Sequence, residues 1–213
     1  KGDIKKLFFI AVLLGTSIFT GVFAFSYWRL KTRTPQAYFE AGKAYYDQGK
    51  FSDATIEFMN ALKRDEAHRD SRYYLALTYI SQQDLGSAIR QLRTLLDAYP
   101  DDVEANLRLG NVYLFGGSFN AQFYGEAQKT AQAILAKDPQ NVPALILTGN
   151  ALAGAKDFSA SVEWLEKAIA LAPLAPQAHH NLGSVFASQG RLSEAGACYR
   201  RALALRADDP VVQ

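Results

Sequence analysis

The stretch "YFEAGKAYYDQGKFSDATIEFMNAL" (Tyr38–Leu62) contains the pattern that decides the fold. Two segments of helical length flank the polar turn around Gly49, and each mixes large apolar residues with small ones. A similar arrangement returns in "HHNLGSVFASQGRLSEAGACYRRALAL" (His179–Leu205). The sequence is therefore predicted to repeat a unit of two helices joined by a short turn.

The repeat has a period of about 34 residues and starts at Pro35. It divides the chain into five blocks, which are Pro35–His68, Arg69–Asp102, Val103–Asn141, Val142–Ala175 and Pro176–Asp209. The eighth position of each block is small, with Gly42, Ala76, Gly110, Gly149 and Gly183. The twentieth position is also small, with Ala54, Ala88, Ala127, Ser161 and Ala195. Large apolar residues fill the eleventh position, with Tyr45, Tyr79, Tyr113, Leu152 and Phe186.

These positions have a mechanical interpretation. Small residues at positions eight and twenty let the two helices of a block approach where they cross, and large residues fill the space beside the crossing. Pro100, Pro139 and Pro173 are predicted to end the second helix of their blocks, because proline lacks the amide donor. One helix pair cannot bury its apolar face alone, so neighbouring pairs are expected to stack.

The pattern resembles the tetratricopeptide repeat (TPR) family over residues 35–209. The fourth position departs from the family, which favours Trp there, and holds Tyr38, Arg72, Asn106, Leu145 and His179. The resemblance implies an all-α fold in which five helix pairs form a right-handed superhelical solenoid. It implies a protein that binds other proteins, and it says little about activity because unrelated functions use this scaffold.

The third block contains five extra residues, around "GGSFNAQFY" (Gly116–Tyr124). A solenoid tolerates an insertion in a loop, because the stacking of its helix pairs is unaffected. Phe119, Phe123 and Tyr124 are nevertheless costly to leave in water, and aromatic residues are favoured at interfaces. They are expected either to fold back on the array or to contact a partner.

The resemblance also implies an inner groove, lined by positions two, five, nine, twelve and thirteen of each first helix. Carried onto this chain, the candidate groove residues are Phe39, Lys43, Tyr46, Tyr73, Leu77, Ile80, Leu107, Asn111, Leu114, Ile146, Asn150 and His180. About half of them are expected to pack on neighbouring helices instead. The set is mostly apolar, which favours a hydrophobic peptide or a helix as the occupant. Family members that clamp a terminal carboxylate need several cations, and here only Lys43 is in place, with Arg108 one position off.

The N-terminal region predicts a membrane anchor. Residues 1–6 form a basic flank, and the uncharged stretch Leu7–Trp28 has the length of one bilayer-spanning helix, about 30 Å. A cleavable signal peptide is the alternative. Residues 29–34 are interpreted as a linker and residues 210–213 as the start of a further segment. Ser17, Gly21 and Ala24 form a small-residue stripe that could admit a partner helix, although such residues are common in membrane helices anyway.

A short basic N-terminus usually stays in the cytoplasm, which would place the repeats on the other side of the membrane. We therefore expect a single-pass protein of the bacterial inner membrane, with its repeats in the periplasm and the lipid bilayer around Leu7–Trp28.

The composition and motifs argue against catalysis and nucleic-acid binding. A net charge of +2 is far from a nucleic-acid binder's strongly basic balance. The single cysteine, Cys198, has no signal of a His-and-acid partner, and His68 is expected on a solvated surface. His179 and His180 are adjacent and point apart on a helix. We expect no catalytic, cofactor-binding or metal site.

The sequence thus favours a non-enzymatic, membrane-anchored scaffold for protein–protein interaction, acting as a subunit or assembly factor of a membrane complex. The alternative is a cell-envelope adaptor, released from its signal segment, that works in the export of polymer or protein. A noncatalytic remnant of an enzyme's regulatory domain is a third, weaker possibility.

Overall fold

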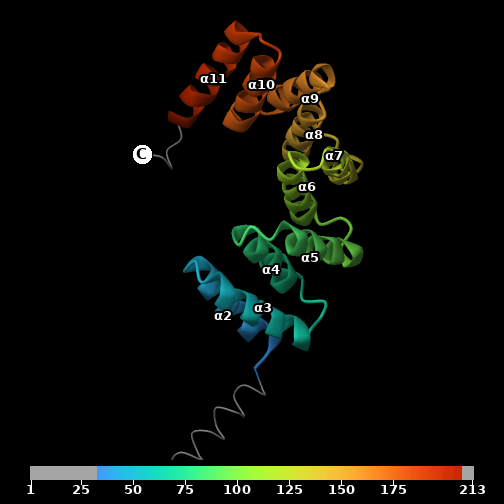
Figure 1. Ribbon diagram of the computed structural model, residues 1–213, viewed down its shortest axis with the longest axis vertical. Helices are drawn as coiled ribbons and strands as arrows, with labels where there is room; N and C mark the ends of the chain where they lie inside the picture. The colour runs from blue at the N-terminus through green and yellow to red at the C-terminus, as the bar shows by residue number, and fades with distance from the viewer. Residues whose placement is uncertain (1–32, 208–213) are drawn as a thin grey trace, which may run out of the picture. The chain divides into compact units, whose positions relative to one another are not determined.

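The computed structural model describes residues 33–207, which form ten α-helices and no strand (Figure 1). The helices are α2 (Pro35–Asp47), α3 (Phe51–Arg64), α4 (Arg69–Ser81), α5 (Leu85–Ala98), α6 (Val103–Gly117), α7 (Gln122–Leu135), α8 (Val142–Gly154), α9 (Phe158–Leu171), α10 (Pro176–Ser188) and α11 (Leu192–Ala207). They make five consecutive pairs. The predicted all-α repeat of five helix pairs is therefore confirmed.

None of the helices within residues 33–207 is long and apolar enough to cross a membrane. The predicted span Leu7–Trp28, its small-residue stripe of Ser17, Gly21 and Ala24, and the segment 210–213 lie outside the described residues. The membrane anchor stays a prediction.

The chain divides into two compact units, one ending at Ser71 and the other starting at Arg72. In the first unit, α2 and α3 pack against each other as a helical hairpin. The predicted role of the eighth position is visible here, because a Cβ placed on Gly42 would lie 2.7 Å from Cδ1 of Phe58. Phe58 occupies the twenty-fourth position and is fully buried. The close crossing of the two helices thus requires glycine at residue 42.

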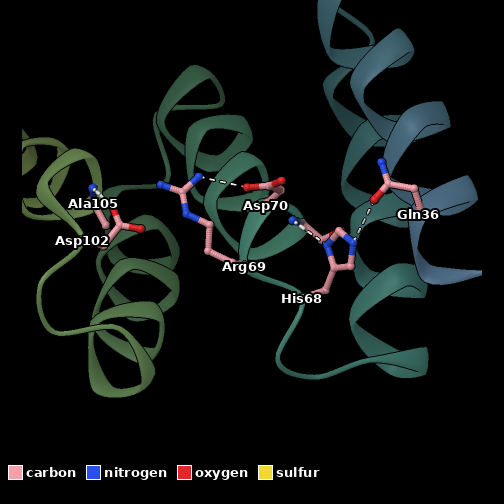
Figure 2. A network of polar contacts seen from close by, with 7 residues as sticks. Gln36, His68, Arg69, Asp70, Asp102 and Ala105 are labelled. Carbon is pink, nitrogen blue, oxygen red and sulfur yellow. Dashed lines mark hydrogen bonds and ion pairs between the residues drawn. The ribbon is translucent and has the colours of Figure 1, made fainter.

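His68 is not the solvated surface residue that the sequence predicted. Its Nδ1 accepts a hydrogen bond from the Ser71 amide at 3.2 Å, which caps the N-terminus of α4. Its Nε2 lies 3.3 Å from Oε1 of Gln36 in α2 (Figure 2). The ring also lies 5.7 Å, between centroids, from the ring of Phe39. The charged residues around His68 suggested an exposed turn, but His68 is half-buried at the N-cap of α4.

In the second unit, the helix pairs stack through a continuous apolar core. One cluster joins α4 to α8, and two smaller clusters continue through α8, α9, α10 and α11. Tyr113, Leu92 and Leu145 are among its largest fully buried side chains. The eighth-position glycines again sit under large neighbours, because a Cβ on Gly149 would lie 2.7 Å from Cγ of Leu165.

Acidic and amide side chains cap the starts of α5, α6, α8 and α9 in the second unit. The carboxylates of Asp84, Asp102 and Asp157 accept hydrogen bonds from backbone amides in the first turns of α5, α6 and α9. The Asp102 bond, from the amide of Ala105, is 2.9 Å long (Figure 2). Asn141 caps α8 in the same way. These helices therefore begin with local polar chemistry.

Candidate functional site

The extra residues of the third block lengthen its first helix, move the start of its second helix and lengthen the turn between them. The first helix, α6, has 15 residues, compared with 13 in each of α4, α8 and α10. The second helix, α7, has 14 residues like α3, α5 and α9, but Ala127 is its sixth residue, whereas the equivalents Ala54, Ala88 and Ser161 are the fourth residues of their helices. The insertion therefore extends the helical hairpin at the end that carries the turn 118–121.

Two of the three inserted aromatic residues fold back on the array. The ring of Tyr124 fills the space over Gly117 in α6 and Gly154 in α8, so that a Cβ on either glycine would overlap it. The ring of Phe123 covers Gly116 and lies 5.4 Å, between centroids, from the buried ring of Tyr113. Glycine at these positions gives the two rings flat surfaces to pack on.

The third inserted aromatic residue does the opposite. Phe119 is 82% exposed, and Phe115 one turn earlier is 62% exposed. Their ring centroids lie 6.2 Å apart, so the two rings form one projecting apolar feature. Two of the inserted rings, Phe123 and Tyr124, therefore anchor the turn, and the third, Phe119, is exposed to solvent.

A groove of about 620 Å³ opens beside these two rings. Its apolar lining residues are Ile80, Leu85, Val112, Phe115 and Phe119. Its polar lining residues are Gln83, Arg108 and Asn111. We name this cavity the α4/α6 groove; all of its lining residues belong to the second unit. An apolar hollow with a few convergent polar groups is the usual form of a binding site.

Arg108 is the one charged residue among the eight that line the α4/α6 groove. The guanidinium of Arg108 and the carboxylate of Glu104 both lie near the hydroxyl of Tyr73. Burial raises the pKa of Tyr73, and the Arg108 guanidinium opposes this rise in pKa. Arg108 itself is exposed at the edge of the groove.

Gln83 adopts a left-handed backbone conformation, with φ at +62°. The same position of the repeat holds Gly49 and Gly190 in the first and fifth blocks, where φ is +72° and +75°. Lys156 holds it in the fourth block, with φ at +66°. A side chain in this conformation is strained relative to glycine, because its Cβ approaches the following carbonyl oxygen.

The structure brings three of the sequence-predicted contact residues together in the α4/α6 groove, namely Ile80, Asn111 and Phe119. Leu77, Leu107 and Leu114 are half-buried and pack against the core cluster of the second unit. Ile146 packs against the two smaller clusters.

Phe39 and Tyr73 are among the candidates that pack on neighbouring helices and do not line an open groove. Both are buried, because the fifth position of their blocks faces the core. The ring of Phe39 packs at 6.0 Å, between centroids, from that of Phe58 in the first unit. Tyr73 belongs to the core cluster of the second unit.

The remaining groove candidates do not line the α4/α6 groove. In the first unit, Lys43 makes an ion pair of 3.0 Å with Asp47, and the ring of Tyr46 packs on Phe51. Asn150 lines a shallow hollow of about 170 Å³ between α8 and α10. The ring of His180 lies 5.4 Å, between centroids, from that of Tyr199 in a hollow of about 400 Å³ on the last helix pair. Within the second unit, Asn150 and His180 therefore line hollows other than the α4/α6 groove.

Sequence reasoning missed five lining residues of the α4/α6 groove as contact candidates, which are Gln83, Leu85, Arg108, Val112 and Phe115. Two of these gave a signal. Phe115 occupies the thirteenth position of its block, an inward position of the repeat, and Gln83 replaces the glycine that other blocks use at the turn. Leu85 and Val112 gave none.

The histidine and cysteine side chains are accounted for by packing. Nε2 of His179 lies 2.9 Å from the carbonyl oxygen of Pro173 and ties the α9–α10 connection. Cys198 is half-buried, and this burial raises the pKa of its thiol. Within the described part of the chain, no three His, Cys, Asp or Glu side chains are grouped as a metal site would require.

Comparison with known families gives a match along the repeats. The family model of the tetratricopeptide repeat matches residues 39–91, 75–119, 119–176 and 165–210. These matches overlap and together span residues 39–210.

Two curated relatives match the repeats in sequence. Protein O-mannosyl-transferase Tmtc1 of Drosophila melanogaster is 30% identical over 139 residues, which is 61% of this chain and 16% of that protein. A peroxisomal targeting signal receptor of Candida albicans is 25% identical over 182 residues, which is 82% of this chain and 30% of the receptor. The chain thus spans less than a third of each relative's length.

Solved structures share the fold at low identity. MamA from Desulfovibrio magneticus RS-1 has a TM-score of 0.69 and 20% identity, covering 82% of this chain and 97% of that one. A thermophilic TPR protein of Thermus thermophilus has a TM-score of 0.67 and 22% identity, covering 83% of this chain and 93% of that one.

Proposed function

The chain belongs to the tetratricopeptide repeat family, and from this premise we propose that it is a non-enzymatic scaffold that holds a partner protein in the α4/α6 groove. The observation that carries the proposal is the exposure of Phe115 and Phe119 beside an apolar hollow. Exposed aromatic residues over a pocket are typical anchors of protein interfaces. The match to a protein named as a targeting signal receptor supports a binding role for this type of repeat.

The chemistry of the groove supports binding rather than catalysis. Its eight lining residues include no hydroxyl, thiol, imidazole or carboxylate that could act as nucleophile, acid or base. Its apolar walls and amide groups suit a peptide surface instead.

We further propose that the scaffold is anchored in a membrane, as a subunit or assembly factor of a membrane complex. The support is the uncharged stretch Leu7–Trp28, whose length matches a bilayer. The proposed setting is the bacterial inner membrane with the repeats in the periplasm. Adding protease to intact spheroplasts tests this orientation, since digestion of the repeats is expected and their survival would contradict it.

Site-specific photocrosslinking tests the binding role. A photoreactive phenylalanine analogue would replace Phe115 in the full chain, and the cells would be irradiated before their membranes are extracted. A discrete adduct of higher mass is expected at this position. The matched control is the same analogue at Leu174, which is 71% exposed and lies away from the groove. Equal crosslinking at both positions, or none at Phe115, would contradict the proposal.

The native mass of the protein in mild detergent separates the two settings of a scaffold. A stoichiometric assembly with co-migrating chains is expected for a subunit of a membrane complex. A lone protomer with a cleaved N-terminus would instead favour the envelope adaptor in export of polymer or protein.

A further inference from the structure

Building on the proposed function, we infer that the α4/α6 groove selects an extended segment of the partner that places an acidic side chain beside apolar ones. The apolar walls of the groove, its one charged residue and its two amide side chains, Gln83 and Asn111, carry this inference together.

The apolar part of the occupant follows from the walls of the groove. Ile80, Leu85 and Val112 form its floor and sides, and the exposed rings of Phe115 and Phe119 stand beside it. A volume of about 620 Å³ is in the range of pockets that enclose a small ligand, so the groove accommodates a few side chains of a segment. Burying two apolar side chains there would also remove the Phe119 ring from water.

The acidic part follows from Arg108. It is the one charged residue that lines the groove, and it is exposed there. The carboxylate of Asp84, beside the lining residues Gln83 and Leu85, already accepts the Ser87 amide at 3.0 Å. A carboxylate on the occupant would complement the Arg108 cation with a charge-assisted hydrogen bond at a partly apolar site.

The extended conformation follows from the amides. Gln83 and Asn111 present side-chain donors and acceptors to the groove. An extended backbone leaves its own amide and carbonyl groups available for such partners, whereas a helix satisfies them internally. Gln83 also keeps a strained φ of +62° where glycine stands in two other blocks.

The carboxylate is assigned to an internal acidic side chain and not to a C-terminus. The groove supplies a single cation, Arg108, for an anionic group. One guanidinium suffices for one aspartate or glutamate side chain.

Affinity selection from a library of random linear peptides displayed on phage, with the full chain as the target, tests the inference. The selected peptides are expected to share one acidic residue next to two apolar ones, without a helical spacing of three and four. Synthetic peptides with amidated C-termini would then be titrated by fluorescence anisotropy. Binding by the amidated form is expected, and a requirement for a free C-terminus would overturn the assignment.

Variants of the full chain sharpen the result. Arg108→Glu is expected to change the selected residue from acidic to basic. Phe119→Ser is expected to weaken binding at least about tenfold, as removal of an interface anchor does. The matched control, Leu174→Ser, also truncates an exposed apolar residue and should leave affinity unchanged. Gln83→Gly is expected to weaken binding several-fold, whereas Lys156→Gly, at the same position of another block, should not.

The outcomes also separate this inference from the proposed function. A crosslink at Phe115 together with peptides of helical spacing, or with no acidic preference, overturns the inference and leaves the scaffold in place. A crosslink at Phe115 without any selected peptide would show that the groove binds a folded surface of the partner. This outcome also overturns the inference. Self-association through Phe119 would show a second copy as the occupant and overturn the inference as well. If neither the crosslink nor a selected peptide is found, the proposed scaffold function and the inference are both rejected.

Discussion

The ring of Tyr124, in the inserted segment, covers Gly154 at the end of α8, and a Cβ on residue 154 would lie 2.5 Å from its Cδ1 atom. Tyr124 lies in α7 and Gly154 lies in α8, and both helices pack in the core of the second unit. Neither residue can therefore move away freely. Gly154→Ala is therefore expected to destabilise the protein by about 1–3 kcal/mol, the usual effect of overpacking. Urea unfolding followed by circular dichroism measures this change.

Gly125 is the matched control for that substitution. It lies in α7 and has no atom within 4 Å of the place where its Cβ would stand. Gly125→Ala should leave stability unchanged or raise it by about 0.5–1 kcal/mol, because alanine favours a helix more than glycine does. An unchanged midpoint for Gly154→Ala would mean that Tyr124 does not pack on residue 154.

Two of the inserted aromatic residues, Phe123 and Phe119, are expected to respond differently to substitution. Phe123→Ser should lose about 2 kcal/mol, less than the roughly 3–5 kcal/mol of a fully buried phenylalanine, because Phe123 is half-buried against Gly116 and Tyr113. Phe119→Ser should leave the free energy of unfolding within about 0.5 kcal/mol, since its ring is in solvent. Equal losses for the two variants would contradict the division between anchoring and exposed rings.

The fold could be predicted from the sequence because the residue pattern that produces it is repeated along the chain. Five blocks each place a small residue at the helix crossing and a large one beside it, so a chance match at one block is corrected by the others. The structure shows the same contact from Gly42 to Phe58 and from Gly149 to Leu165. This contact joins two residues of the same repeat, and a pattern of this kind can be recognised in a single sequence.

The candidate site could be predicted only in part, because it depends on what does not repeat. The family positions indicated Ile80 and Asn111, which line the α4/α6 groove, but they also indicated Phe39 and Tyr73, which are buried in the core. The fate of the inserted rings depended on whether Gly117 and Gly154 face each other across two helices. Such a long-range match between a ring and two glycines has no periodic signal in the sequence.

Gln83 and Lys156 offer a test of backbone strain. Both hold a positive φ where the first and fifth blocks have glycine. Gln83→Gly and Lys156→Gly should each stabilise the protein by about 0.5–1 kcal/mol, because relief of the left-handed strain exceeds the added entropy of the unfolded chain. Thermal unfolding measures both. Loss of stability in either variant would show that its side chain contributes more in contacts than its backbone loses in strain.

Asp84 predicts a dependence of stability on pH. Hydrogen bonds from the side chain and the amide of Ser87 lower the pKa of this carboxyl group. The unfolded chain therefore binds the proton more readily than the folded one. The stabilisation is complete above the ordinary aspartate pKa, about 3.9, and is lost as the pH falls through the lowered value.

Comparison of variants isolates this contribution from that of other carboxylates. Asp84→Asn keeps a capping oxygen, so its stability should differ least from the original chain at low pH and most at neutral pH. Asp84→Ala should lose about 1 kcal/mol at neutral pH, the usual effect of removing an N-cap. Urea unfolding at about pH 3 and pH 7 gives the two values. A difference that does not change with pH would exclude a titrating cap.

His68 is expected to stabilise the start of α4 by accepting a hydrogen bond. Its Nδ1 meets the Ser71 amide at 3.2 Å, so the ring must leave this nitrogen without a proton while Nε2 faces Gln36. His68→Ala removes the cap and should destabilise the helix start by about 1 kcal/mol. His68→Asn keeps an oxygen at the N-cap and should recover most of that loss. Hydrogen exchange at the Ser71 amide, followed by NMR, is the direct measurement, because faster exchange in the alanine variant alone assigns the effect to the cap. Equal exchange in both variants would show that packing on Phe39, and not the hydrogen bond, holds this end of α4.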